Sequence, residues 1–108
     1  MLLTKGAQID FQDNEGKTAL IYASSKIIIL DQKSIKLLIK KGANLNIKDK
    51  DGKTALIHAV LNNNLKTVKT LLKNKAKVDI KDNNNTTALI YAQKNSFSSI
   101  ITLLQKQW

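Results

Sequence analysis

Apolar residues recur along the chain in short clusters that have helical spacing. Three of these clusters follow a threonine that comes after a turn, so we expect helices with Thr18, Thr54 and Thr87 as N-caps. The buried stripes of these helices are predicted to be Leu20, Ile21 and Ala23; Leu56, Ile57 and Ala59; and Leu89, Ile90 and Ala92. The alanine that closes each stripe is small, so neighbouring helices can approach closely there.

A second set of helices is predicted, one after each helix of the first set. Apolar residues stand here at i, i+3 and i+4, with lysine on the opposite side, which indicates one buried and one exposed face. These apolar positions are Ile35, Leu38 and Ile39; Val68, Leu71 and Leu72; and Ile101 and Leu104. The chain is therefore predicted to alternate between two kinds of short helix.

The two kinds of helix belong to a unit that is written three times. The segment TALIYA at Thr18–Ala23 returns as TALIHA at Thr54–Ala59 and as TALIYA at Thr87–Ala92. The offset between the threonines is 36 residues and then 33 residues. Repetition at a nearly fixed period indicates a solenoid, in which each unit buries its apolar face only against its neighbours.

Short alternating stretches at 45–47 and 78–80 connect the units, and we expect them to project as hairpin-like fingers. Gly16 and Gly52 supply the positive φ that such fingers need, and Asn85 takes the same place in the third unit. Lys75 stands where the preceding units have Gly6 and Gly42. If the backbone is left-handed there, this lysine costs about 1 kcal/mol.

The central unit reads DKDGKTALIHA at Asp49–Ala59, continues with Val68, Leu71 and Leu72, and closes with KAKVD at Lys75–Asp79. In order and spacing it resembles the ankyrin repeat, which opens D-x-x-G-x-T-P-L-H-x-A and closes G-A-x-V-N. The family's proline is replaced by alanine at positions 19, 55 and 88, and its histidine by isoleucine at 21, 57 and 90. The resemblance covers nearly the whole chain. It implies an all-α ankyrin-repeat solenoid of stacked helix-turn-helix units with projecting hairpin-like fingers, the first helices inside and the second outside.

We expect a single domain over residues 1–108, in which 1–12 is the tail of a partial repeat, 13–48 and 49–81 are full repeats, and 82–108 is an incomplete third repeat. Two interpretations stay open: a fragment of a longer array, or a small complete protein. Leu2 and Leu3 lack the polar outer face of a capping unit. The apolar run Ile27–Leu30 either packs against a preceding unit or forms an exposed edge, so self-association through uncapped ends is one expectation.

The chain is lysine-rich, and its charge raises the question of a nucleic-acid partner. The formal net charge is +10, and all eighteen basic residues are lysines. Base readout favours arginine and stacking aromatic residues, which are absent or few, and a coding bias explains the lysines equally well. Nucleic-acid or polyanion binding is therefore the weaker hypothesis. With no cysteine, no membrane-length apolar run and no secretory signal, we expect a soluble, cytoplasmic protein without disulfides.

No group of residues indicates catalysis, a metal site or a cofactor site, and the chain is predicted to be non-enzymatic. His58 is the only histidine, and no cysteine is present to pair with it. Acidic pairs such as Asp49 with Asp51 recur at the period of the turns, where aspartate caps backbone N–H groups. We therefore assign these carboxylates a structural role.

The resemblance implies a protein-interaction module. Its concave face, made of the inner helices and the finger tips, is expected to contact a partner protein. An acidic partner is compatible with the lysines. The alternative is a structural segment of a larger array. Tyr22, His58 and Tyr91 form a ladder that either anchors the partner or packs between adjacent inner helices. The predicted partner-binding residues are Lys17, Tyr22, Lys50, Asp51, Lys53, His58, Asn62, Lys81, Asn84, Tyr91 and Lys94.

Overall fold

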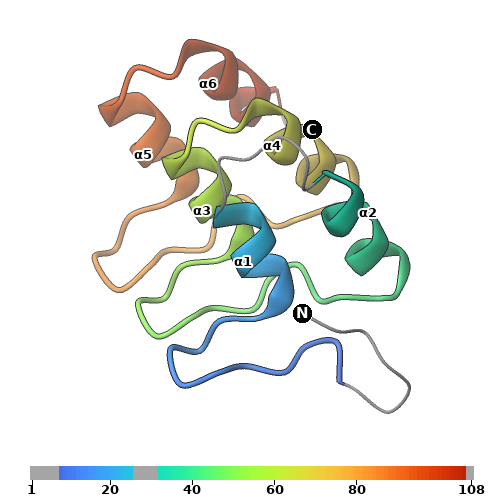
Figure 1. Ribbon diagram of the computed structural model, residues 1–108. Helices are drawn as coiled ribbons and strands as arrows, with labels where there is room; N and C mark the ends of the chain where they lie inside the picture. The colour runs from blue at the N-terminus through green and yellow to red at the C-terminus, as the bar shows by residue number, and fades with distance from the viewer. Residues whose placement is uncertain (1–7, 26–31, 107–108) are drawn as a thin grey trace.

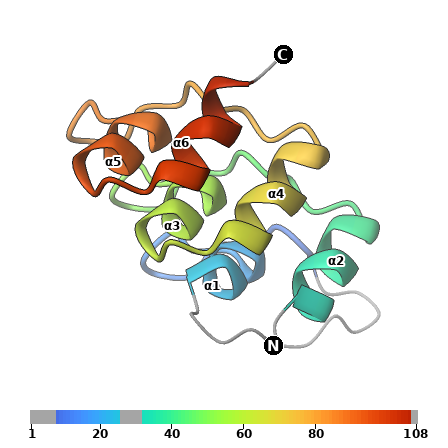
Figure 2. The ribbon, with the colours of Figure 1, turned by 90° about the horizontal axis from the view of Figure 1, so that it is seen from above.

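The computed structural model describes residues 8–25 and 32–106 (Figure 1). Helices and turns, without strands, make up this part of the chain, as the sequence pattern predicted. The inner helices α1, α3 and α5 lie in one layer and the outer helices α2, α4 and α6 in a second (Figure 2). The helices are α1 (Ala19–Ser25), α2 (Gln32–Lys40), α3 (Ala55–Leu61), α4 (Leu65–Lys73), α5 (Ala88–Lys94) and α6 (Ser98–Gln105). The predicted run Ile27–Leu30 and the residues Leu2 and Leu3 lie outside the described residues.

The three threonines begin the inner helices as predicted. The Oγ1 atoms of Thr18, Thr54 and Thr87 accept hydrogen bonds from the backbone N–H groups three residues later, at 3.2, 3.3 and 3.3 Å. Each bond satisfies one of the N–H groups that a helix start leaves without a partner. The inner helices therefore begin at equivalent places in all three units.

The core lies between the two helix layers, and the central pair α3 and α4 contributes more of it than either other pair. Ile57, Ala59, Val60, Val68 and Leu71 are 0–1% exposed. Helix α3 contacts α1 on one side, α5 on the other and α4 behind. Helix α4 likewise contacts three helices, α3, α2 and α6, so this central pair is packed on more sides than the helices of the outer units.

One predicted core position is wrong. Ile90 is 37% exposed, whereas the equivalent residues Ile21 and Ile57 are 1% exposed. Helix α1 is followed by α3 and α3 by α5, but no further inner helix covers α5 in the described part of the chain. Conversely, Ile100 was not predicted as a core residue and is fully buried on α6.

The connections that precede the inner helices project to one side as three fingers (Figure 1). The fingers contain the segments 10–17, 46–53 and 79–86. Gly16, Gly52 and Asn85 have φ of 75°, 79° and 63°, so the predicted left-handed turn is confirmed in all three. Asn85 is tolerated there because a short polar side chain is among the few that visit this region.

Lys75, directly after the C-cap of α4, also has a left-handed backbone, with φ of 71°. Its N–H donates to the carbonyl of Leu72 at 3.0 Å and so closes the end of the helix. The equivalent residue after α2 is Gly42, with φ of 93°. The lysine therefore holds a backbone conformation that favours glycine.

We expect Lys75→Gly to raise the free energy of unfolding by about 1 kcal/mol, because glycine removes the Cβ conflict of the left-handed conformation. Urea unfolding followed by circular dichroism measures this change. Lys77→Gly is the control, since Lys77 is exposed and is not among the residues with positive φ. That control should lower stability through the extra chain entropy of glycine. Equal effects at the two positions would contradict a strain specific to Lys75.

Candidate partner-binding surface

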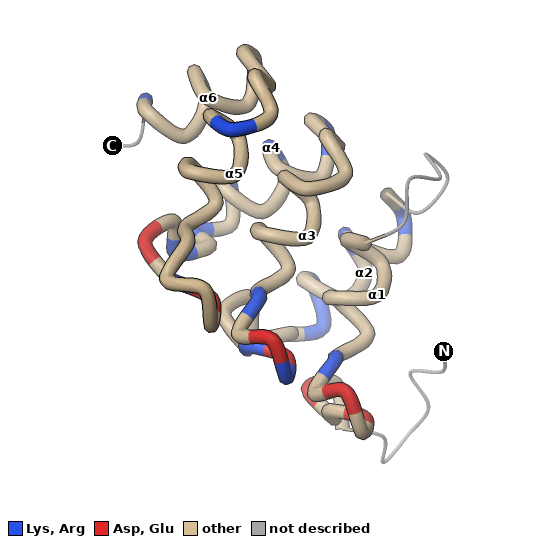
Figure 3. The backbone as a smooth tube through the Cα atoms, turned by 90° about the vertical axis from the view of Figure 1, so that its left-hand side faces the viewer, with Lys and Arg blue, Asp and Glu red and all other residues tan. Residues whose placement is uncertain are grey.

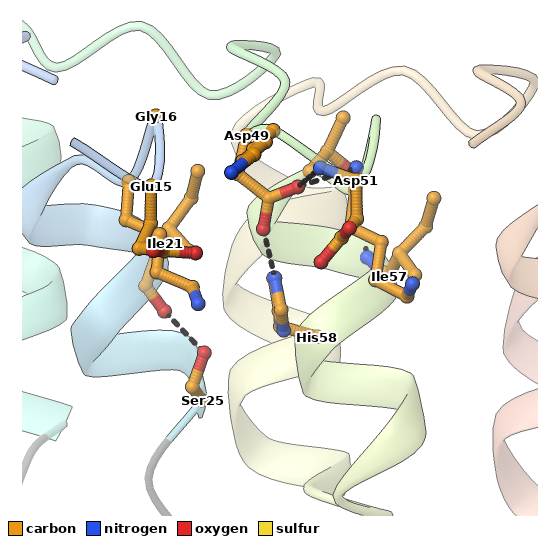
Figure 4. A network of polar contacts seen from close by, with 12 residues as sticks. Glu15, Gly16, Ile21, Ser25, Asp49, Asp51, Ile57 and His58 are labelled. Atoms are coloured by element: carbon orange, nitrogen blue, oxygen red, sulfur yellow. Dashed lines mark hydrogen bonds and ion pairs between the residues drawn. The ribbon is translucent and has the colours of Figure 1, made fainter. Parts of the chain in front are cut away.

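An aspartate organises the tip of each finger. In the second finger, Oδ1 of Asp49 accepts from the N–H groups of Asp51 and Lys53, both at 2.9 Å (Figure 4). Asp13 and Asp82 accept in the same way from the residues two and four positions later. The predicted turn-capping role of these carboxylates is confirmed.

The second oxygen of each aspartate ties the finger to its own inner helix. Nε2 of His58 donates to Oδ2 of Asp49 at 2.8 Å, between the finger and α3 (Figure 4). The hydroxyls of Tyr22 and Tyr91 donate to Oδ2 of Asp13 and Asp82 in the same manner. The two interpretations offered for this ladder, partner anchor and interhelical packing, both missed that its polar tips are occupied within the molecule. We call these three aspartate–aromatic pairs the clamps.

The clamps change the pKa of the groups that form them. Burial raises the pKa of Asp49, but hydrogen bonds from His58 and from the N–H groups of Lys53 and Asp51 outweigh it, so the net pKa is lowered. The pKa of Asp82 is also lowered, because hydrogen bonds from Tyr91 and two N–H groups outweigh burial. The bond to Asp82 raises the pKa of Tyr91. The folded protein therefore favours ionised aspartates.

The free energy of unfolding should consequently depend on pH in the acid range. A carboxyl whose pKa is lowered by folding contributes stability above the pKa of the unfolded chain and loses it as pH falls through the lower, folded value. We expect the urea midpoint to be level from about pH 7 to about pH 5 and to fall between about pH 4 and about pH 2. Tyr91→Phe should flatten this fall and cost about 1 kcal/mol at neutral pH. An identical acid slope in the variant would argue against the clamp at Asp82.

Hydrogen bonds also join each finger to the next. The N–H of Lys50 donates to the carbonyl of Glu15 at 2.8 Å, and the N–H of Asn83 donates to the carbonyl of Asp51 at 3.0 Å. The Asn83 side chain adds a bond to the carbonyl of Lys50 at 2.9 Å. The three fingers therefore form one connected layer. They lie side by side in Figures 1 and 3.

Two predicted contact residues make bonds within the molecule. Nζ of Lys53 lies 3.8 Å from Oδ2 of Asp82, so it joins the second finger to the third. Nδ2 of Asn62 donates to the carbonyls of Ser25 and His58 at 2.6 and 3.1 Å, which joins the ends of α1 and α3. Both side chains are half-buried.

The predicted set divides by exposure and by place. The half-buried members are Lys17, Lys53, His58, Asn62 and Tyr91, and the exposed members are Tyr22, Lys50, Asp51, Lys81, Asn84 and Lys94. The structure gathers most of them at the fingers and the first turns of the inner helices, but Asn62 is the C-cap of α3 and Lys94 is the last residue of α5. These two lie at the other end of the inner helices.

Sequence reasoning missed Phe11 on this surface, and it placed Asn83 on the third finger without predicting its bonds to the second finger. Phe11 is 68% exposed on the first finger, where the equivalent residues Ile47 and Ile80 are half-buried. Asn83 makes two of the bonds between fingers. The aromatic residue in an otherwise aliphatic position was a usable signal for Phe11, whereas nothing local distinguishes Asn83 from its asparagine neighbours.

The charge of this surface is mixed. The finger segments 10–17, 46–53 and 79–86 hold seven of the eight acidic residues of the chain together with five lysines. Acidic and basic residues accordingly lie close together along the fingers in Figure 3. The outer helices α2 and α4, by contrast, carry six lysines and no acidic residue. The net positive charge therefore lies mainly behind the fingers.

A comparison with known families agrees with the threefold repeat. A family model described as ankyrin repeats (3 copies) matches residues 27–107. The chain belongs to the ankyrin-repeat family. Ankyrin repeats are generally protein–protein interaction modules, and the family is generally non-enzymatic. A search of curated proteins gave no match to this ankyrin-repeat chain.

Over residues 8–25 and 32–106, no three metal-ligating side chains of His, Cys, Asp or Glu come together. Within the same ranges, no helix has the length and apolar character needed to cross a membrane.

Proposed function

We propose that this ankyrin-repeat chain binds a partner protein through its finger tips and the first turns of its inner helices. One observation carries the proposal: the three fingers are joined to the inner helices by clamps and to each other by backbone hydrogen bonds. A surface that is already ordered loses less conformational entropy when it binds. The exposed side chains on this layer are therefore presented at fixed spacing.

The partner proposed here carries charges of both signs. Exposed lysines such as Lys50 and Lys81 alternate along the fingers with carboxylates such as Asp51. Charge patterns that alternate in this way select a complementary pattern and disfavour a uniformly charged ligand. Phe11 and Tyr22, 68% and 44% exposed, supply aromatic contact area next to these charges. We assign them the anchoring role at the first finger.

The test compares three proteins as bait in affinity capture with quantitative mass spectrometry: the unaltered chain and two double variants. Lys50→Glu with Lys81→Glu alters the fingers, and Lys36→Glu with Lys40→Glu makes the same charge change on exposed positions of α2. A partner of the finger surface should be lost by the first variant and kept by the second. Titration of a recovered partner should show at least a tenfold weaker Kd for the finger variant.

Phe11→Ala tests the anchoring role of Phe11. We expect this variant to lose about 2 kcal/mol of binding free energy and to keep nearly the same stability, because truncation of an exposed aromatic hot spot weakens binding alone. Equal losses from both double variants, with affinity falling steeply as salt rises, would instead indicate a polyanion held by overall charge. That result would overturn the finger surface as the binding site.

A further inference from the structure

A second surface lies on the outer-helix side of the molecule. An open hollow of about 690 Å³ is formed by α4, by the chain segment that follows it and by Leu103 on α6. Pockets that hold ligands typically measure about 300–1,000 Å³. None of the eleven predicted partner-binding residues lines this hollow. The two surfaces can therefore be altered separately.

Four lysines line the hollow: Lys69 and Lys73 from α4, and Lys75 and Lys77 from the segment after it. Asp79 is the one acidic residue among the lining residues. The ion pairs found in residues 8–25 and 32–106 are Lys53–Asp82 and His58–Asp49, so these four ammonium groups have no carboxylate within pairing distance there. Like charges around one hollow repel one another, and an acidic ligand relieves that repulsion.

Apolar side chains form the rest of the lining. Leu72 and Ala76 are each 8% exposed, and Val78 and Leu103 are half-buried. A phosphate chain or a nucleic-acid backbone offers nothing to such a floor. The lining fits a ligand that combines carboxylates with an apolar side chain.

The backbone of Lys75 is an independent indication of function. This lysine holds φ of 71° where the equivalent residue in the preceding unit is Gly42. A strained residue that persists where glycine would relieve the strain is typical of functional sites. Here the strained position is the one that adds an amine to the hollow.

We propose that the hollow binds an acidic peptide segment of a partner protein, with an apolar side chain on Leu72, Ala76 and Val78 and its carboxylates among the four lysines. This site is separate from the finger surface, which carries both charges. The acidic partner suggested by the lysine content is thus assigned to the outer-helix side. Binding of the acidic peptide in the hollow does not depend on the finger surface being a binding site.

The repeat supplies a matched control for the test. Lys36 and Lys40 on α2 are equivalent to Lys69 and Lys73 on α4, and all four are exposed. The unit that contains them has Gly42 and Asn44 in place of Lys75 and Lys77. Lys36→Glu with Lys40→Glu therefore makes the same change in charge, on the same helix positions, outside the hollow.

The probe is a short fluorescent peptide in which glutamates flank a leucine and a phenylalanine, titrated by fluorescence anisotropy at physiological salt. Each exposed ion pair contributes up to about fivefold in affinity. We expect Lys69→Glu with Lys73→Glu to weaken Kd by at least tenfold and the α2 control to change it less than twofold. A peptide with serines in place of the two apolar residues should bind at least tenfold more weakly, since the floor is then unused.

Lys75→Gly separates binding from folding. It should raise the melting temperature, since it removes strain, and yet weaken peptide binding about threefold to fivefold, since it removes an amine. A more stable variant with unchanged affinity would show that Lys75 is only a structural substitution. Absence of binding to the unaltered chain, equal losses from the two double variants, or equal binding of the serine peptide would overturn the proposal. Displacement of the peptide by inorganic polyphosphate, with polyphosphate binding more tightly, would assign the hollow to polyanions instead.

Discussion

Gly52→Ala is expected to lower the free energy of unfolding by about 3 kcal/mol, although it adds only one methyl group. Two costs combine at this residue. Its φ of 79° is left-handed, which costs a residue with a side chain about 1–2 kcal/mol. A Cβ atom built on Gly52 would also lie 2.6 Å from Oδ1 and 2.7 Å from the backbone N of Asn83. These distances are far below van der Waals contact, so the third finger must move.

Gly42→Ala is the matched control for this prediction. Gly42 has φ of 93°, but a Cβ there would meet nothing within 4 Å. This variant should therefore show the cost of the backbone alone, about 1–2 kcal/mol. Urea unfolding of both variants measures the difference. Equal losses at the two positions would mean that the fingers are not packed against each other as described.

The double variant Gly52→Ala with Asn83→Ala tests whether the side chain or the backbone of Asn83 blocks the new methyl group. Asn83→Ala removes Oδ1 from the path of the new methyl group but leaves the backbone N in place. It also removes the side-chain bond to the carbonyl of Lys50. We expect it to restore only part of the stability lost by Gly52→Ala. Full recovery would show that the backbones of the two fingers can separate at little cost.

Features set by neighbours in sequence were predictable. The caps at Thr54 and Thr87, and the left-handed turns at Gly52 and Asn85, depend on residues within about one helical turn of each other. Their residue types identify them wherever they occur. The periodic repetition then predicted the alternation between the two helix layers in the described part of the chain.

Contacts between segments were not predictable in the same way. The bond from His58 to Asp49 joins residues nine positions apart, and it exists only because α3 turns back beneath its own finger. The bond from Asn83 to Asp51 requires the exact offset between two fingers, which composition does not contain. The exposure of Ile90 depends on which element lies next to α5, although its local pattern matches that of Ile57. Such features follow from packing rather than from local propensity.

The candidate site shows the same division. The family pattern indicated fingers and inner helices, and the exposed lysines and carboxylates there follow from the turns. The separation of charge, with carboxylates in the fingers and lysines alone on α2 and α4, is visible in the sequence once the elements are placed. The hollow beside Lys75 could not be predicted from the sequence, because it forms only where α4, the segment after α4 and α6 come together.

Ala59→Leu is expected to lower the free energy of unfolding by about 3 kcal/mol, the upper end of the usual cost of forcing extra methylenes into a packed core. Ala59 is 0% exposed on α3, which contacts α1, α5 and α4. Its carbonyl also accepts the N–H of Asn64 at 3.0 Å, which holds the turn between α3 and α4. A larger side chain must therefore displace a helix or break this turn. The measurement is urea unfolding followed by circular dichroism.

Ala92→Leu makes the same substitution at the equivalent position of α5, where the alanine is also 0% exposed. Helix α5 contacts α3 and α6, and none of the described helices lies on its remaining side, so it can shift outward to admit the leucine. We expect the cost at Ala92 to be smaller, about 1–2 kcal/mol. An unchanged unfolding midpoint for Ala59→Leu would show that Ala59 is not at a close helix crossing. Equal costs at the two positions would show instead that α5 is held as firmly as α3, and that its outer side is covered in solution.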